Sequence, residues 1–242
     1  MYSARRVALT ADKKTQCLED LRMRILTQEI APGSDLDEAT LCDRYGMSRT
    51  PMREILQRLG GEGYVDLTQN RGAKVASMDL PVLRTFFQTA PMIYANVARL
   101  AAENRKAGEV APLKAIQERF RAATQAGDAA EAALQNHRFH LAMGEMAHNP
   151  YLLPSLKRML IDHTRLSQTF YRPASEDEAA RVVTACAHHD AMIEAIERQE
   201  PGVIVDLTIA HWNLSRDRLE RFVSPDPLPI DVLPMKDRED AV

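Results

Sequence analysis

The sequence predicts a mainly α-helical protein in two parts, a small helical domain ending in a β-hairpin and a larger all-helical domain. Apolar residues recur at helical spacing along most of the chain, and alternation typical of strands is confined to one short segment. Glycine is more frequent in the first third than afterwards, whereas all seven histidines lie in the second half. We therefore expect domains at residues 1–77 and 78–222, followed by a flexible tail at 223–242.

The composition excludes several classes of protein. The chain has 242 residues, of which 45% are hydrophobic and 27% charged, so it is long enough for two cores and too apolar to be disordered. It has no apolar run of 18 residues and no signal peptide, so we expect no membrane partner and a cytoplasmic location. Three scattered cysteines, Cys17, Cys42 and Cys186, argue against a disulfide framework or a thiolate zinc site.

Charge is distributed unevenly between the two parts. Residues 1–77 hold 12 Lys or Arg against 11 Asp or Glu, and the remainder holds 19 against 23. Because the net charge of the whole chain is −3, any binding to nucleic acid must come from local patterning in the first domain.

Turn and capping residues predict two helices at the start of the first domain. Leu21 and Ile25 belong to an apolar stripe at helical spacing that precedes Pro32-Gly33, a helix-ending signal. Asp37 can cap a short second helix that ends at Gly46.

A third helix with two distinct faces is predicted to follow this glycine. Ser48 is the expected cap, and Pro51 falls in the first turn, where no intrahelical hydrogen bond is lost. Two short helices joined by a glycine turn form a helix-turn-helix pattern. At about 100° per residue, the apolar face holds Met52, Ile55, Leu56 and Leu59. The opposite face holds Arg49, Thr50, Arg53 and Gln57.

The polar face of the third helix suits DNA. Arginine, hydroxyl and amide groups near a helix start can bind phosphates and read base edges in the major groove. The following segment alternates apolar residues around Gln69-Asn70-Arg71-Gly72, which predicts a β-hairpin, or wing, with a basic tip. A solvated charged face is the alternative for the helix alone, but it would not require the glycine turn and the basic hairpin.

Six helices are predicted in the second domain, where glycine and proline separate the periodic segments. A bundle of helices of this length can enclose a ligand cavity. The expected ranges are 79–105, 109–126, 128–147, 150–171, 175–199 and 201–222.

Histidine placement is the chemical signal of the bundle. Asn136 and His140 lie one turn apart on one helix face, and His189 and His211 fall on the last two helices. Imidazole nitrogens from three helices, with one oxygen donor, suit a divalent metal such as zinc or nickel. Taken singly, each histidine is more often a hydrogen-bonded structural residue, and spacing alone leaves their convergence open.

The segments "MSRTPMRE" and "RGAKV", together with the "PG" turn, resemble the winged helix-turn-helix domain of the GntR family of bacterial transcription regulators over about 55 residues. The pair Gly60-Gly61 departs from the family, which usually continues the third helix there, and favours a shorter helix. The DNA-contacting positions that the resemblance implies are Ser48, Arg49, Thr50, Arg53, Arg71 and Gly72.

The segments "NHRFHLAMGEMAHNPYL" and "HHDAMIEAI" resemble the FCD effector domain of one GntR subfamily, over about residues 79–222. Many FCD domains bind a metal through an Asp and three His, which implies Asn136, His140, His189 and His211 as ligands here. Asn in place of Asp keeps a carbonyl oxygen but loses a charge, so weaker metal binding is expected. Ala90 and Tyr94 stand where the family usually has Arg and Glu, so effector contacts are expected to differ.

In this family the metal commonly helps to hold a small carboxylate effector. The candidate effector-binding residues are His163, Arg165, Tyr171 and Asn213, although each is equally suited to a solvated or capping role.

An enzyme is not expected, because the sequence has no HExxH motif, no glycine-rich phosphate loop and no GxSxG elbow. We expect a repressor that binds a short inverted repeat of DNA as a homodimer and responds to a small organic acid. The alternatives are a DNA-binding regulator with a purely structural metal and no effector, and a metal-dependent hydrolase.

Overall fold

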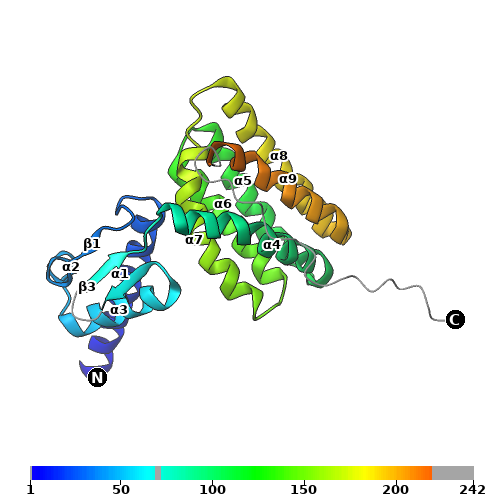
Figure 1. Ribbon diagram of the computed structural model, residues 1–242. Helices are drawn as coiled ribbons and strands as arrows, with labels where there is room; N and C mark the ends of the chain where they lie inside the picture. The colour runs from blue at the N-terminus through cyan, green and yellow to red at the C-terminus, as the bar shows by residue number, and fades with distance from the viewer. Residues whose placement is uncertain (1, 69–71, 220–242) are drawn as a thin grey trace.

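The computed structural model describes residues 2–68 and 72–219, and the side chains of residues 12–67 and 72–215. The mainly helical fold is confirmed: a small domain with a three-stranded sheet lies beside a larger bundle of helices (Figure 1). Arg71 at the hairpin tip and the predicted tail at 223–242 lie outside the described residues. None of the helices in the described part of the chain combines the length and apolarity needed to cross a bilayer.

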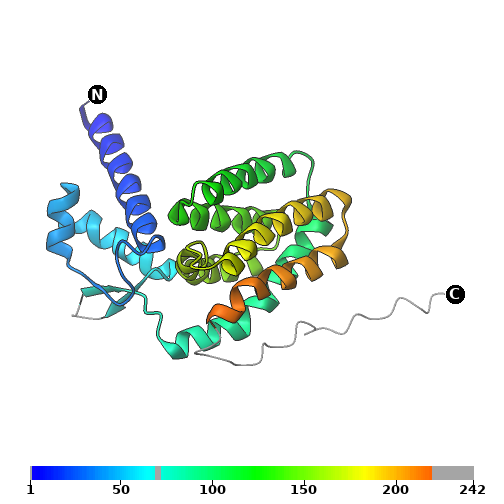
Figure 2. The same ribbon diagram turned by 90° about the horizontal axis from the view of Figure 1, so that it is seen from above.

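The N-terminal domain is built from three helices and a small antiparallel sheet. The helices are α1 (Tyr2–Leu26), α2 (Glu38–Tyr45) and α3 (Arg49–Glu62). The strands are β1 (Asp35–Leu36), β2 (Val65–Thr68) and β3 (Gly72–Val75), in the order β1-β3-β2. The predicted hairpin is therefore present, whereas the two-residue β1 is too short to produce a periodic signal in the sequence. Figure 2 shows α1 extending from this domain to the N-terminus.

The predicted caps and faces of α2 and α3 are confirmed, with one exception. The Asp37 side chain accepts a hydrogen bond from the Thr40 amide, and Gly46 ends α2 with a left-handed backbone (φ 58°). Ser48 occupies the cap position of α3, but its side chain makes no capping hydrogen bond. The apolar face of α3 is buried against α1, so the polar face is left at the surface.

The expectation that Gly60-Gly61 shortens the third helix is wrong, since α3 continues to Glu62. A Cβ atom at position 60 would lie only 2.8 Å from Leu67 Cδ1, because the hairpin packs closely on this turn. Gly63, with φ 88°, then ends the helix.

The larger domain contains helices close to the expected ranges. They are α4 (Leu80–Asn104), α5 (Val110–Gln125), α6 (Ala129–Met146), α7 (Leu152–Phe170), α8 (Glu176–Arg198) and α9 (Pro201–Leu219). Side-chain caps explain three of the starts, because Asp79, Asp128 and Ser175 each accept a hydrogen bond from a backbone amide three residues on.

Helix α7 contacts the N-terminal domain. The fully buried Arg165 donates to the carbonyl oxygen of Ala76, in the link between β3 and α4, at 2.7 Å. Arg165 also pairs with the buried carboxylate of Asp162, and its own carbonyl accepts from the Gln28 side chain. Asp162 also forms an ion pair with Arg158, at 2.9 Å. The Arg158 side chain lies against Gly63 at the end of α3. These contacts join α7 to α1, to the end of α3 and to the interdomain link.

We expect Arg165→Met to destabilise the protein by about 3 kcal/mol, because it leaves a buried carboxylate with one cation fewer and removes the donor to Ala76. The value is at the low end for a buried pair, since Arg158 still contacts Asp162. Urea unfolding measures it, and the exposed Arg172 supplies a matched control as Arg172→Met. Equal unfolding midpoints for the two variants would contradict this role.

Candidate nucleic-acid interface and candidate metal centre

The first two turns of α3 present two arginines to solvent. The side chains of Arg49 and Arg53 are 71% and 62% exposed, and both face Glu38 at the start of α2. Arg53 Nε donates to one Glu38 oxygen at 2.7 Å, and Arg49 Nε lies 3.8 Å from the other. The hydrogen bond and the charge of Glu38 raise the pKa of Arg53. One carboxylate thus holds two guanidinium groups side by side on an exposed helix face.

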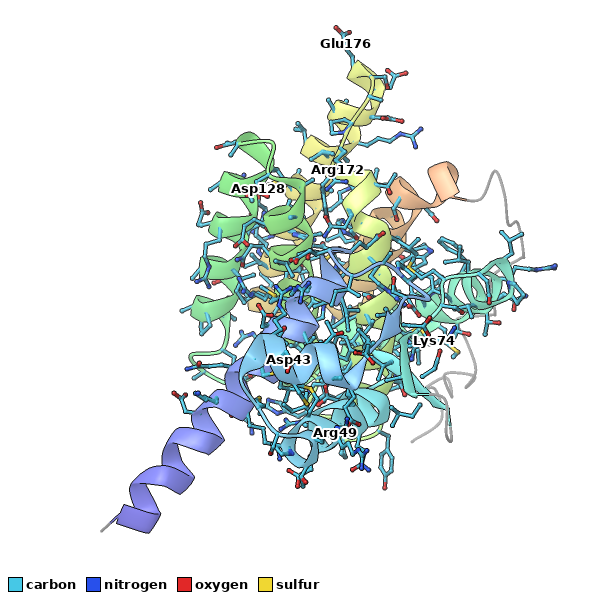
Figure 3. The ribbon with its side chains drawn as sticks, turned by 90° about the vertical axis from the view of Figure 1, so that its left-hand side faces the viewer. Asp43, Arg49, Lys74, Asp128, Arg172 and Glu176 are labelled. Carbon is cyan, nitrogen blue, oxygen red and sulfur yellow. The ribbon has the colours of Figure 1, made fainter. Side chains whose placement is uncertain are left out.

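Other predicted DNA-contacting residues share this surface. Ser48 and Thr50 are exposed, and Gly72 begins β3 with a positive φ of 82° that suits a glycine. Figure 3 shows Arg49 and Lys74 on the N-terminal domain, far from Glu176 at the other end of the molecule.

Glu38 was not identified from the sequence. Glu38 can pair with both arginines only because of the way α2 packs against α3, and this packing leaves no pattern in the sequence. In the sequence, Glu38 is only an acidic residue that follows a helix cap.

Three of the four predicted metal ligands meet inside the bundle. His140 on α6, His189 on α8 and His211 on α9 each offer a nitrogen, and these atoms all lie within 4.8 Å of one another. The ring centroids of His189 and His211 are 4.7 Å apart, and those of His140 and His189 are 5.5 Å apart. We call these three residues the histidine cluster.

Each of the four predicted ligands has one buried polar atom that finds no hydrogen-bond partner among the described residues. These atoms are Asn136 Oδ1, His140 Nε2, His189 Nε2 and His211 Nδ1. A buried polar atom left unsatisfied costs about 1–3 kcal/mol. Two of the four atoms lie one turn apart on α6 and the others on α8 and α9, so they need a common explanation. A metal ion bound by three imidazoles and an amide oxygen accounts for all four, and the donor set fits zinc or a similar divalent ion.

Burial keeps the cluster in the form that a metal requires. Desolvation, reinforced by the neighbouring imidazoles, lowers the pKa of His140 and His189 well below the usual range and that of His211 to about 3. The three rings are therefore neutral near pH 7, and neutral imidazole is the metal-binding form.

Gln117 on α5 orients His189 and was missed in the sequence. Its Nε2 donates to the Cys186 carbonyl and to Asp190 Oδ1, each at 3.0 Å, which fixes the direction of the amide. Its Oε1 therefore accepts from His189 Nδ1, at 3.0 Å, and leaves Nε2 of that ring as a lone pair facing the cluster. Gln117 and His189 are 72 residues apart in the sequence, so no local motif connects them. The sequence shows only a glutamine on an apolar helix face.

Two of the four candidate effector-binding residues lie near the cluster. The ring of His163 is 5.5 Å from that of His140, and its Nδ1 shares a hydrogen bond of 2.7 Å with the Tyr94 hydroxyl. Tyr171 is buried further from the cluster: its ring contacts Phe120, and Phe120 in turn contacts His189.

The other two are not brought to the cluster. Arg165 faces the N-terminal domain. It follows His163 by two residues, so its side chain points about 200° around the helix axis from that of His163. Arg165 therefore lies between the two domains and away from the histidine cluster. Asn213 is exposed on α9, although its neighbours His211 and Trp212 are buried.

Comparison with known proteins finds the same two units. The profile of bacterial regulatory proteins of the gntR family matches residues 13–75, and the FCD domain profile matches residues 87–214. The galactonate operon transcriptional repressor of Escherichia coli K12 is 24% identical over 208 residues, covering 75% of this chain and 90% of that protein. The Glc operon transcriptional activator of the same organism is 26% identical over 209 residues, covering 76% and 80%.

Solved structures share the fold. The Escherichia coli protein McbR/YncC superposes with a TM-score of 0.70 at 18% identity, covering 87% of this chain and 96% of that chain. A putative GntR regulator from Rhodococcus sp. RHA1 gives 0.57 at 15% identity, covering 84% and 98%.

We expect Gln117→Leu to weaken zinc binding about 10- to 100-fold, because it removes the acceptor that fixes the tautomer of His189. Competition with a chromophoric chelator measures the affinity. Gln125→Leu, at an exposed glutamine of the same helix, should bind zinc like the parent. Equal affinities for the two variants would rule out this orienting role.

Proposed function

The chain belongs to the GntR family of bacterial regulatory proteins, in the branch with an FCD domain, and we propose that a bound metal and a small organic acid control its affinity for DNA. Like its relatives, it is a DNA-binding transcription regulator and not an enzyme. The finer proposals concern the DNA contacts, the metal, the effector and the direction of control.

The paired arginines of α3 are the observation that carries the DNA-binding proposal. Arg49 and Arg53 are exposed on a helix whose opposite face is buried, so the helix can enter a major groove without losing its packing. Thr50 and the wing at Gly72 would add contacts, and Arg71 is proposed with them by resemblance. We infer that a homodimer places two such helices in successive grooves, about 34 Å apart, of a short inverted repeat.

The unpaired buried atoms of the bundle support a metal site. Asn136, His140, His189 and His211 would hold the ion, with zinc the first candidate. All four ligands are neutral, so none of them reduces the charge of a divalent ion. When bound, such an ion supplies a strong electrostatic attraction for an anionic effector. Substitution of Asn for Asp therefore lowers metal affinity and leaves more charge for the effector.

Helix α7 supplies a route between the two sites. One of its faces carries His163, beside the histidine cluster, and another carries Arg158 and Arg165, against the N-terminal domain. An effector that displaces α7 would change how the N-terminal domain is held. A coupling of about 1–3 kcal/mol would alter operator affinity 5- to 150-fold.

We infer repression relieved by the effector as the direction of control. Displacement of α7 weakens contacts that position the N-terminal domain, which favours release of DNA. The galactonate relative is a repressor and the Glc relative an activator, so similarity alone leaves both directions open. Such a regulator would act in the cytoplasm, where bacterial DNA lies.

We expect Arg53→Ala to weaken binding by about 1–3 kcal/mol to a DNA fragment that the parent protein selects from a random library. The loss follows from removing one exposed guanidinium of the proposed contact face. Arg58→Ala is the matched control, since Arg58 is also 62% exposed on α3 but pairs with Glu62 on another face. Fluorescence anisotropy measures both, and equal loss from the two variants would contradict the assignment.

We expect His189→Ala to lose bound metal, because it removes one of three converging imidazoles. Elemental analysis of the purified variant measures the metal per chain. His148→Ala provides the control, since His148 lies outside the cluster and pairs with Glu109 at 3.1 Å. Parent-like metal content in the His189 variant would remove the basis of the metal proposal.

A further inference from the structure

An apolar cavity lies beside the histidine cluster, between α4, α7 and α9. Its walls include Phe86, Phe87, His163, Leu166, Phe170 and Trp212. We call it the aromatic cavity. Thr169, which is exposed, stands at its rim, so the cavity lies close to the surface at one end.

Aromatic rings form a continuous layer from this cavity to the cluster. The Trp212 ring centroid lies 5.5 Å from that of Phe86, 6.0 Å from that of Phe87 and 5.7 Å from that of His163. The ring of His163 in turn lies 5.5 Å from that of His140 in the cluster. A molecule in the aromatic cavity would therefore have one end separated from the proposed metal by a single ring.

The cavity offers few groups for hydrogen bonding. Among the described residues that line it, none is charged. The Ser167 hydroxyl donates to the His163 carbonyl at 2.8 Å, and the Ser215 hydroxyl donates to the Trp212 carbonyl at 3.0 Å. The Nδ1 atom of His163 is engaged with the Tyr94 hydroxyl.

We propose that the effector is a monocarboxylate with a flat apolar body, in the first instance an aromatic acid, and not a polyhydroxylated sugar acid. This inference rests on the proposed metal and effector site. The carboxylate would be directed toward the metal, and the apolar body would pack between the rings of α4 and α9. Each hydroxyl of a sugar acid would lose water on entering and find almost no donor or acceptor in return, whereas an aromatic ring buries apolar surface there.

Entry of such a ligand requires the helices to separate. The free space in the cavity is about 20 Å³, whereas cavities that bind benzene are on the order of 150 Å³. Phe86 and Phe87 lie in the second turn of α4, which follows the link held by Arg165 at Ala76. A ligand that moves these rings therefore moves α4 relative to α7, at the point where the N-terminal domain is attached.

The sole tryptophan of the chain makes the test direct, because Trp212 is part of the cavity wall. The zinc-loaded full-length protein is titrated with phenylacetate, benzoate, acetate and D-galactonate, with Trp212 emission and the thermal unfolding midpoint as readouts. We expect both aromatic acids to change the emission and raise the midpoint, with at least about tenfold lower Kd than acetate or galactonate.

Matched variants locate the binding. Phe87→Leu, which keeps an apolar side chain but removes a ring, should weaken phenylacetate binding several-fold while its zinc content stays at the parent level. Tyr151→Leu, at an aromatic residue 85% exposed on the surface, should change neither. Zinc content verifies that the Phe87 variant is folded.

Galactonate binding as tight as that of the aromatic acids would overturn the inference and leave the proposed effector control intact. Loss of response to every acid, in protein that carries zinc and binds its selected DNA, would overturn the inference together with the effector proposal. Parent-like phenylacetate binding by folded Phe87→Leu would also overturn it, because the acid would then bind elsewhere.

Discussion

The histidine cluster of the helical domain contains buried lone pairs for which the described residues supply no hydrogen-bond partner. Three imidazoles meet there from α6, α8 and α9, and Asn136 lies one turn before His140; within the described residues, each of the four has an atom without a hydrogen-bond partner. The surrounding packing allows them little freedom: the ring of His189 stacks on Phe139 with centroids 3.9 Å apart, and Gln117 fixes its tautomer. Such an arrangement is costly in an apolar interior unless a cation completes it, which supports the proposed metal centre over a set of structural histidines.

Under the proposed function, helix α7 would make this centre a control element, because its two faces contact different sites. His163 faces the cluster and the aromatic cavity, whereas Arg165 lies two residues away and holds the interdomain link at Ala76. A change in packing on the first face would therefore be transmitted over about half a helical turn to the second. The N-terminal domain would receive the change at the end of α3, the helix whose other end carries Arg49 and Arg53. The proposed ligand and DNA sites are thus joined by helices in direct contact.

Local signals in the sequence are sufficient to predict the helices, the β2–β3 hairpin and the two faces of α3, but not the two-residue β1. Capping residues such as Asp79 and Asp128 mark helix starts, and apolar spacing identifies the buried side of a helix without reference to its neighbours. Contacts between distant helices leave no local pattern, so the sequence does not reveal the roles of Glu38 and Gln117. Helix propensity at Gly60-Gly61 takes no account of the hairpin, which packs against Gly60 through Leu67. Helical periodicity alone places Arg165 and His163 on different faces of α7.

Anomalous X-ray scattering from crystals of the full-length protein, recorded on both sides of the zinc absorption edge, tests the central claim most directly. The account predicts an edge-dependent peak about 2.0–2.2 Å from the facing atoms of His140, His189, His211 and Asn136. Water or direct hydrogen bonds at those four atoms, with no transition-metal signal in protein purified without chelators, would contradict it.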